Sequence, residues 1–302
     1  MTQAEKLLKE YLDYLEIEKN RSVKTRENYE RYLKYFFNFA KINSVEDITE
    51  TAVREFRLSL ARSKGSEGTV LKKNTQSYYA IAVRNFLKYL ARHDYKTLAP
   101  EKIELPKLGM RQIDIVEYKD LERMLEAPKG DSLRAVRDRA ILELLFSTGL
   151  RLAELCSLSR YLDFNRGEIT VRGKGDKLRV VFVSGRARGA IKEYLEKRAD
   201  AGETLFISLT KKGKPLGRIN PRTVQRIVDK YAREAGIMDP VTPHTFRHMF
   251  ATDLLMNGAD LRSVQALLGH SNVATTQIYT HLTNKELREI HKAFHGTRRG
   301  EK

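Results

Sequence analysis

Apolar residues recur every three or four positions along most of this chain, and this helical spacing limits the possible folds more than any other feature. In residues 4–17, for example, Leu8, Leu12 and Leu15 fall on one side of a helix. Only 7 prolines interrupt the 302 residues, which are rich in helix-forming types. The spacing therefore predicts a mainly α-helical protein.

Strict alternation replaces the helical spacing once, around residues 161–183. Ile169 and Val171, then Val180 and Phe182, predict two strands joined by a turn at residues 173–177 (GKGDK). We therefore expect one small antiparallel sheet within a mostly helical, mixed α/β domain.

The chain is expected to form two domains. Residues 1–95 predict a bundle of four helices with basic residues interleaved. Residues 96–113 contain Pro100, Pro106 and Gly109, lack a steady period and predict a linker. Residues 114–302 form the second domain. Its longer helices are expected at residues 118–125, 133–146, 186–198, 221–235, 243–256, 261–268 and 275–294.

A basic surplus is present in both halves of the chain. The formal net charge is +17, and Lys and Arg outnumber Asp and Glu by 21 to 15 in residues 1–108 and by 35 to 24 in the remainder. This distribution suits a protein that closes around a polyanion, because binding releases condensed counterions. A merely soluble basic protein is the alternative, and charge alone does not distinguish DNA from RNA.

Cys156 is the only cysteine, so an internal disulfide and a thiolate zinc site are both excluded. It lies in an apolar run, which predicts a buried, unreactive thiol. The sequence has no run of 18 apolar residues and no apolar signal core at its N-terminus. We expect a cytoplasmic protein that does not associate with a membrane.

Residues 242–247 (TPHTFR) have the composition of a helix start, with Thr242 as the cap and Pro243 as the first helical residue. His244 and Arg247 are three positions apart and so share a face near the positive end of this helix. A phosphate would be favoured there. The alternative is two polar residues on a solvated face.

Four further residues could take part in chemistry, although each also has an ordinary structural interpretation. Arg151 follows a glycine turn and has Glu154 one helical turn later, an arrangement also typical of a simple ion pair. Lys174 lies in the predicted hairpin turn, where surface lysines are common. His270 follows a glycine at a predicted helix end, and Tyr279 lies in a helix, where most tyrosines only pack.

Taken together and in order, these segments resemble the tyrosine recombinases of the phage-integrase family, specifically their Xer-like branch. The resemblance is carried by residues 148–158 (TGLRLAELCSL), 172–177 (RGKGDK), 244–255 (HTFRHMFATDLL), 267–272 (LLGHSN) and 275–281 (TTQIYTH). It extends over nearly the whole chain. It implies a SAM-like core-binding domain at the N-terminus and a catalytic domain at the C-terminus.

The resemblance also implies a role for each of these residues. Tyr279 would attack a DNA phosphodiester, forming a 3′-phosphotyrosine and releasing a 5′ hydroxyl. Arg151 and Arg247 would bind the non-bridging oxygens, and His244 would act in proton transfer with the tyrosine.

Three supporting roles complete the implied site. Lys174 would protonate the leaving 5′ oxygen, His270 would hydrogen-bond the phosphate, and Glu154 would orient Arg151 or His244. The sequence contains neither a carboxylate cluster suited to Mg²⁺ nor a GxxxxGK[ST] phosphate loop. We therefore expect a reaction that needs no metal, nucleotide or other cofactor.

The expected partner is double-stranded DNA with paired half-sites, bound by a homotetramer or by a heterotetramer with a paralogous recombinase. A DNA translocase is a further possible partner. In related recombinases the terminal helix docks into a neighbouring subunit, and by analogy Ile290 and Phe294 are the candidate anchors. A helix packed on its own domain is the alternative.

The length of the chain favours resolution of chromosome or plasmid dimers. Three alternatives stay open at this point. The first is an integrase or transposase of a mobile element. The second is a type IB topoisomerase, which relaxes supercoils as a monomer. The third is a DNA-binding protein without catalytic activity.

Overall fold

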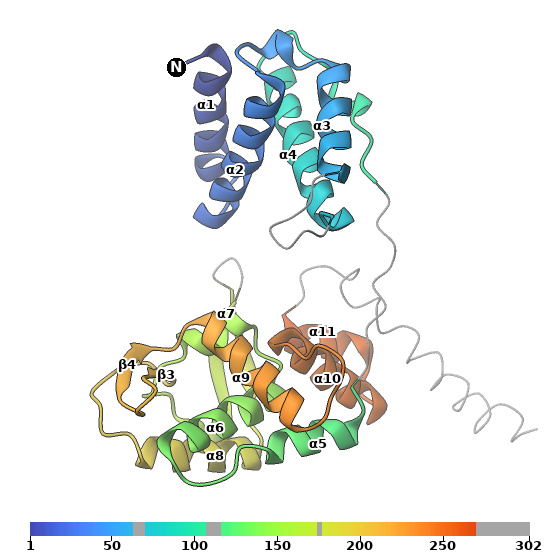
Figure 1. The fold of residues 1–302 in the computed structure, drawn as a ribbon. Helices are drawn as coiled ribbons and strands as arrows, with labels where there is room; N and C mark the ends of the chain where they lie inside the picture. Colours follow the sequence, from blue (N-terminus) through green and yellow to red (C-terminus); the bar gives the residue numbers. More distant parts are fainter. Residues whose placement is uncertain (63–69, 107–115, 174–176, 270–302) are drawn as a thin grey trace, which may run out of the picture. The chain divides into compact units, whose positions relative to one another are not determined.

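The structure is a computed structural model of the 302-residue chain and describes residues 1–62, 70–106, 116–173 and 177–269. The chain divides into two compact units, Met1–Met110 and Arg111–Lys302, and each has its own hydrophobic core. The expected mainly helical fold is confirmed (Figure 1). Within the described ranges, no helix has the length and apolar character that a membrane crossing requires.

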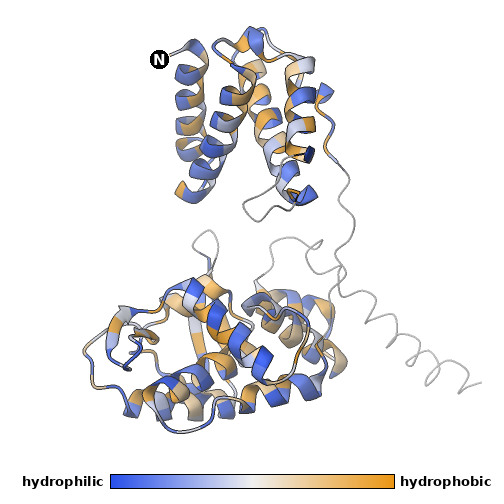
Figure 2. Ribbon diagram, in the orientation of Figure 1, coloured by the Kyte–Doolittle hydropathy of each residue, from blue (hydrophilic) through white to orange (hydrophobic). Residues whose placement is uncertain are grey.

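Among its described residues, the N-terminal unit has four α-helices and two short 3-10 helices. They are α1 (Gln3–Ile17), α2 (Val23–Ala40), η1 (Val45–Asp47), α3 (Glu50–Arg62), α4 (Lys73–Arg92) and η2 (Pro100–Lys102). Thr2 and Ser22 cap α1 and α2 through their side-chain oxygens. Tyr11, Phe36 and Phe86 are fully buried between the helices. Figure 2 shows hydrophobic and hydrophilic residues distributed around each helix, as in amphipathic helices.

Part of the segment expected as a linker packs on the N-terminal core. Pro100 and Ile103 are buried, and Leu98 lies against the same cluster. The short helix η2 contacts α4, so residues 98–103 extend the bundle by one turn. These apolar residues are too few and too irregularly spaced to reveal a period, although they are sufficient to close the core. Residues 107–113 of the expected linker lie outside the described ranges.

The C-terminal unit is assembled around one buried helix, α6 (Leu133–Thr148). The other helices in the part of this unit that the structure describes are α5 (Tyr118–Glu126), α7 (Leu152–Ser157), η3 (Phe164–Arg166), α8 (Gly185–Glu196), α9 (Pro221–Glu234), α10 (Pro243–Met256) and α11 (Leu261–Leu268). The strands are β1 (Glu168–Arg172), β2 (Leu178–Phe182), β3 (Ile207–Leu209) and β4 (Pro215–Arg218). Helix α6 packs against α8, α10, α5 and α9, and is therefore buried on nearly all sides (Figure 1).

An ion pair lies inside this core. The Nη2 atom of Arg137 is 2.6 Å from Oδ1 of Asp138, and both side chains are at least 97% buried. The hydroxyl of Tyr231 also donates to Asp138, and Arg137 donates to the carbonyl of Ile207. Burial raises the pKa of Asp138 in spite of these partners. The cluster is thus enclosed by α6, α9 and β3.

The two predicted strands are confirmed as an antiparallel hairpin of β1 and β2. Ile169 and Val171 of β1 are buried, as is Val181 of β2. Val180 and Phe182, whose alternation predicted the second strand, lie on the opposite, exposed face with relative exposures of 45% and 57%. The inward-facing residues of β2 therefore include a charged one, Arg179, which pairs in register with Val171.

A second antiparallel hairpin, β3–β4, was not predicted, so the expectation of a single small sheet was wrong. Strand β3 has only three residues, and β4 (PLGR) is exposed throughout. Neither strand carries the alternation that would identify it in the sequence.

Cys156 lies in α7 with a relative exposure of 3%, in agreement with the predicted buried thiol. Burial raises the pKa of this thiol to about 11. Very little reactive thiolate is therefore present at neutral pH.

Candidate functional site

The site begins where α6 ends. Gly149 terminates the helix with φ of +57°, and a Cβ at this position would lie 2.5 Å from a ring carbon of Phe250. Both the left-handed backbone and the close contact with α10 therefore favour glycine. The chain then turns into α7, whose first turn presents Arg151 and Glu154 to the same space.

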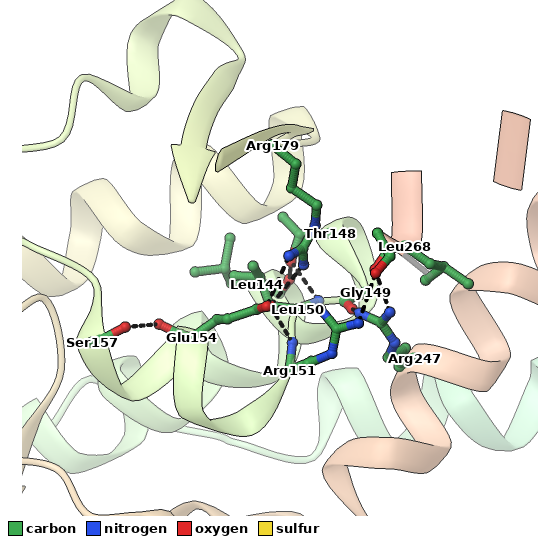
Figure 3. A network of polar contacts seen from close by, with 11 residues as sticks. Leu144, Thr148, Gly149, Leu150, Arg151, Glu154, Ser157, Arg179, Arg247 and Leu268 are labelled. Carbon is green, nitrogen blue, oxygen red and sulfur yellow. Dashed lines mark hydrogen bonds and ion pairs between the residues drawn. The ribbon is translucent and has the colours of Figure 1, made fainter. Parts of the chain in front are cut away.

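The buried carboxylate of Glu154 joins two arginines (Figure 3). It accepts hydrogen bonds from the backbone N–H and the Nη1 atom of Arg151, at 2.8 Å and 2.9 Å. It also accepts from both terminal nitrogens of Arg179, at 2.8 Å and 2.7 Å. The expected pairing of Glu154 with Arg151 is present, whereas the described contacts of Glu154 do not include His244.

Two opposing effects set the charge of Glu154. Burial raises the pKa of its carboxyl, but the hydrogen bonds from Arg179 and Arg151 lower it more, to about 2. The side chain is 5% exposed and stays ionised at neutral pH. Glu154 is therefore a fixed negative charge between two guanidiniums.

Arg247 reaches the same region from α10. The helix starts as predicted, with the Thr242 side chain accepting a hydrogen bond from the N–H of Thr245, and with Pro243 in the first turn. Arg247 is 3% exposed and donates to the carbonyl of Gly149 at 2.7 Å and to the carbonyl of Leu268. The alternative of two residues on a solvated face therefore does not hold for Arg247, because backbone carbonyls replace water around its charge.

Arg151 and Arg247 both bind the C-terminal end of α11. The Nη2 atom of Arg151 donates to the carbonyl of Gly269 at 2.9 Å, next to the carbonyl of Leu268 bound by Arg247. The carbonyls at the end of a helix lack partners within the helix and carry partial negative charge, so cations stabilise them. Two arginines that are far apart in sequence are thereby held side by side (Figure 3).

His244 is exposed one helical turn before His248. The two imidazole rings are 4.3 Å apart between centroids and lie edge to face. The predicted helix thus places His244 at the surface near the start of α10, whereas Arg247 points into the protein.

Three of the predicted catalytic residues, Lys174, His270 and Tyr279, lie outside the described ranges, as do Ile290 and Phe294. Of the remaining predicted residues, the structure brings together Arg151, Glu154 and Arg247. Sequence reasoning did not identify Arg179 as the second partner of Glu154. The alternation in β2 could have indicated only that Arg179 shares a face with Val181, and not that it contacts Glu154.

Groups of three or more His, Cys, Asp or Glu side chains that could hold a metal ion are not found among residues 1–62, 70–106, 116–173 and 177–269. The charges that gather at the site are instead the partly exposed guanidinium of Arg151 and the buried guanidinium of Arg247. They lie beside the ion pair of Glu154 and Arg179. This arrangement is suited to binding an oxyanion such as a phosphate.

Comparison with known families agrees with this arrangement. The model of the phage integrase family matches residues 115–286. The model of the phage integrase N-terminal SAM-like domain matches residues 8–94. Together these two matches cover most of both units.

The similarity extends to individual proteins over nearly their whole length. The chain is 37% identical to tyrosine recombinase XerC of Thermodesulfovibrio yellowstonii, over 98% of this chain and 98% of that protein. It is 35% identical to tyrosine recombinase XerD of Listeria monocytogenes, over 96% of this chain and 98% of that protein. Its fold is similar to that of the XerH site-specific recombinase bound to difH substrate, with a TM-score of 0.66, 24% identity, and coverage of 95% of this chain and 83% of that one.

Proposed function

The chain belongs to the phage integrase family and is a Xer-type site-specific recombinase that cleaves and rejoins DNA, and we propose that Tyr279 forms the covalent bond to the DNA strand. One observation supports this assignment more than any other. Arg151 and Arg247 meet at the Leu268–Gly269 helix end, directly before His270 in the chain. A phosphate bound there would lie beside Gly269, the residue from which the chain continues toward Tyr279.

In the proposed mechanism, Arg151 and Arg247 bind the two non-bridging oxygens of the scissile phosphate. Guanidiniums are planar and permanently charged, so they suit the pentacoordinate transition state, in which negative charge on these oxygens increases. The backbone contacts of Arg247 and the Glu154 contact of Arg151 fix both groups before DNA binds. Such preorganisation stabilises the transition state without a reorganisation cost.

The bond changes are balanced between the attacking and leaving oxygens. The phenolic oxygen of Tyr279 bonds to phosphorus as the bond from phosphorus to the 5′ oxygen breaks. His244 accepts the proton of the phenol, and Lys174 supplies a proton to the 5′ oxygen. His270 donates a hydrogen bond to the phosphate. Rejoining is the reverse reaction with a different 5′ hydroxyl, and because the phosphotyrosine retains the bond energy, no nucleotide is consumed.

DNA is the partner of the enzyme, and we further propose that four subunits assemble on paired half-sites. The tetramer is either a homotetramer or shared with a paralogue, and its task is the resolution of chromosome or plasmid dimers in the cytoplasm. A DNA translocase could activate it. Support comes from the names of two relatives of similar length, tyrosine recombinases XerC and XerD, which do not favour a mobile-element integrase or a type IB topoisomerase.

Capture of the covalent intermediate tests the assignment of Tyr279. The protein is incubated with a pool of nicked suicide duplexes that carry a randomised central segment, and complexes that resist denaturation are isolated and sequenced. We expect wild-type protein to form them and Tyr279→Phe to bind DNA without forming any, because the nucleophilic oxygen is absent.

Tyr161→Phe is the matched control, since Tyr161 is 73% exposed and has no part in the proposed site. This variant should form adducts as the wild type does. An adduct that persists in Tyr279→Phe would remove Tyr279 from its role, and the absence of any wild-type adduct would contradict the proposed reaction.

A further inference from the structure

Arg179 has an unusual position for a charged residue in a surface hairpin. It lies in β2 between Leu178 and Val180, which are both exposed, so the strand directs its side chain inward beside Val181. The side chain is only 11% exposed. A charge buried to this extent requires a specific partner.

That partner is Glu154, and the geometry of the pair is bidentate. Nη1 of Arg179 bonds to Oε1 at 2.8 Å, and Nη2 bonds to Oε2 at 2.7 Å. This parallel arrangement is the strongest form of an arginine–carboxylate contact. Arg151 shares the same carboxylate but uses only Nη1 for its side-chain bond, while its Nη2 bonds to Gly269.

Close packing also restricts the aliphatic part of Arg179. A Cβ placed on Gly269 would lie 2.9 Å from the Cδ atom of Arg179, and one on Gly173 would lie 3.0 Å from its Nη1. Arg179 is therefore held between β1 and the end of α11. Oε2 of Glu154 also accepts the backbone N–H of Arg151, but the bidentate contact with Arg179 prevents both oxygens from turning toward the Arg151 guanidinium.

We propose that Arg179 is a positioning residue for DNA cleavage, which saturates the Glu154 carboxylate so that the Arg151 guanidinium stays directed at the scissile phosphate. This inference rests on the proposed role of Arg151. Without Arg179, the carboxylate binds the guanidinium of Arg151 with both oxygens and draws it away from Gly269. Arg179 itself touches neither the DNA nor the reacting atoms.

The test measures single-turnover adduct formation on a duplex selected from the nicked pool, together with DNA affinity and thermal unfolding. Arg179→Met should lower the cleavage rate about 100-fold, the effect expected when a reacting group is displaced by about 1 Å. DNA affinity should be unchanged. Arg179→Lys should recover part of the rate, because lysine keeps the charge but cannot form the bidentate contact.

A double variant separates positioning from mere packing. If Arg179 acts through Glu154, then Glu154→Gln combined with Arg179→Met should cleave no more slowly than the slower single variant. Additive losses would overturn the proposal, as would a wild-type rate in either Arg179→Met or Arg179→Lys. The lysine variant keeps the test decisive if the methionine variant does not fold.

Arg166→Met provides the matched control, because the Arg166 side chain is 79% exposed and pairs with Asp163 on the surface. It should cleave at the wild-type rate. When wild type and Arg166→Met form adducts and Arg179→Met does so equally fast, the positioning role fails while the proposed reaction stands. When the wild type forms no adduct, the proposed reaction itself fails.

Discussion

The Arg137–Asp138 pair and the Glu154 cluster both lie in the C-terminal unit, and they differ in their surroundings. Arg137 and Asp138 are enclosed by α6, α9 and β3, and burial raises the pKa of the carboxyl. Glu154 is equally buried but accepts bonds from two guanidiniums, which lower its pKa to about 2. One of these, Arg151, keeps 33% of its side chain exposed. The Arg137–Asp138 pair is thus closed off from solvent, whereas the Glu154 cluster presents the Arg151 cation to solvent, although the ion-pair distances in the two are similar.

The largest difference should appear when each cluster loses an arginine. Arg137→Ala leaves Asp138 without its charge partner in the core, and should cost about 3–5 kcal/mol of unfolding free energy. Arg151→Ala should cost only about 1 kcal/mol, because Arg179 still neutralises Glu154 and the lost contact is partly exposed. Urea unfolding measures both values.

The same two variants should rank in the opposite order for activity per folded molecule. Arg151→Ala should lower adduct formation about 10²–10³-fold, since the proposed donor to the transition-state oxyanion is lost. Residual folded Arg137→Ala should cleave DNA normally. Equal stability losses in the two variants would show that the enclosed and the open cluster do not differ as described.

Lowering the pH should change the contributions of Glu154 and Asp138 to stability in opposite directions. The pKa of Glu154 falls from 4.5 to about 2 on folding, so its stabilisation is complete above pH 4.5 and is lost as the pH falls toward 2. The stability deficit of Glu154→Gln relative to wild type should therefore shrink in acid, by on the order of 3 kcal/mol over the full interval.

For Asp138 the pKa is raised on folding, so the wild type gains stability relative to Asp138→Asn as the pH falls through that value. The stability deficit of Asp138→Asn relative to wild type should therefore grow in acid, while the deficit of Glu154→Gln shrinks. Chemical denaturation between about pH 6 and pH 3 measures both trends. Deficits that change in the same direction would contradict the assigned charge states.

The smallest effect concerns the glycine that packs on Arg179. Gly269 and Gly236 both follow helices with positive φ, of +63° and +75°, but only Gly269 lies against a side chain. Replacement by alanine should cost each about 1–2 kcal/mol for the left-handed backbone. Gly269→Ala should in addition displace Arg179 and slow adduct formation, whereas Gly236→Ala should leave the rate unchanged. Equal rates in both variants would indicate that this packing does not affect the Glu154 cluster.

Sequence periodicity predicted most of the helices because they carry an apolar stripe, whereas α6, which is buried on nearly all sides, was predicted from its run of helix-forming residues. The start of α10 at Pro243 and the end of α11 at Gly269 follow from local capping chemistry. The β3–β4 hairpin and the packing of Ile103 could not be predicted in this way. Both depend on contacts with distant residues and leave no period in their own segments.

The site shows the same division between local and distant contacts. Arg151 and Glu154 are three positions apart on one helix, so their pairing could be predicted from spacing. The contact between Glu154 and Arg179 joins a helix to a strand, and spacing contains no information about it. The contacts of Arg247 with backbone carbonyls could not be predicted either, because every residue type carries the same carbonyl group.

The buried position of Cys156 has a practical consequence for measurements on this enzyme. The chain has one cysteine, its side chain is 3% exposed, and its thiol pKa is about 11. Maleimide reagents attack thiolates, so the native thiol reacts slowly at neutral pH. A fluorophore can therefore be attached to a cysteine introduced at the surface of either unit while Cys156 stays in place. With one such dye on each unit, energy transfer can then report whether the distance between the two units changes when DNA binds.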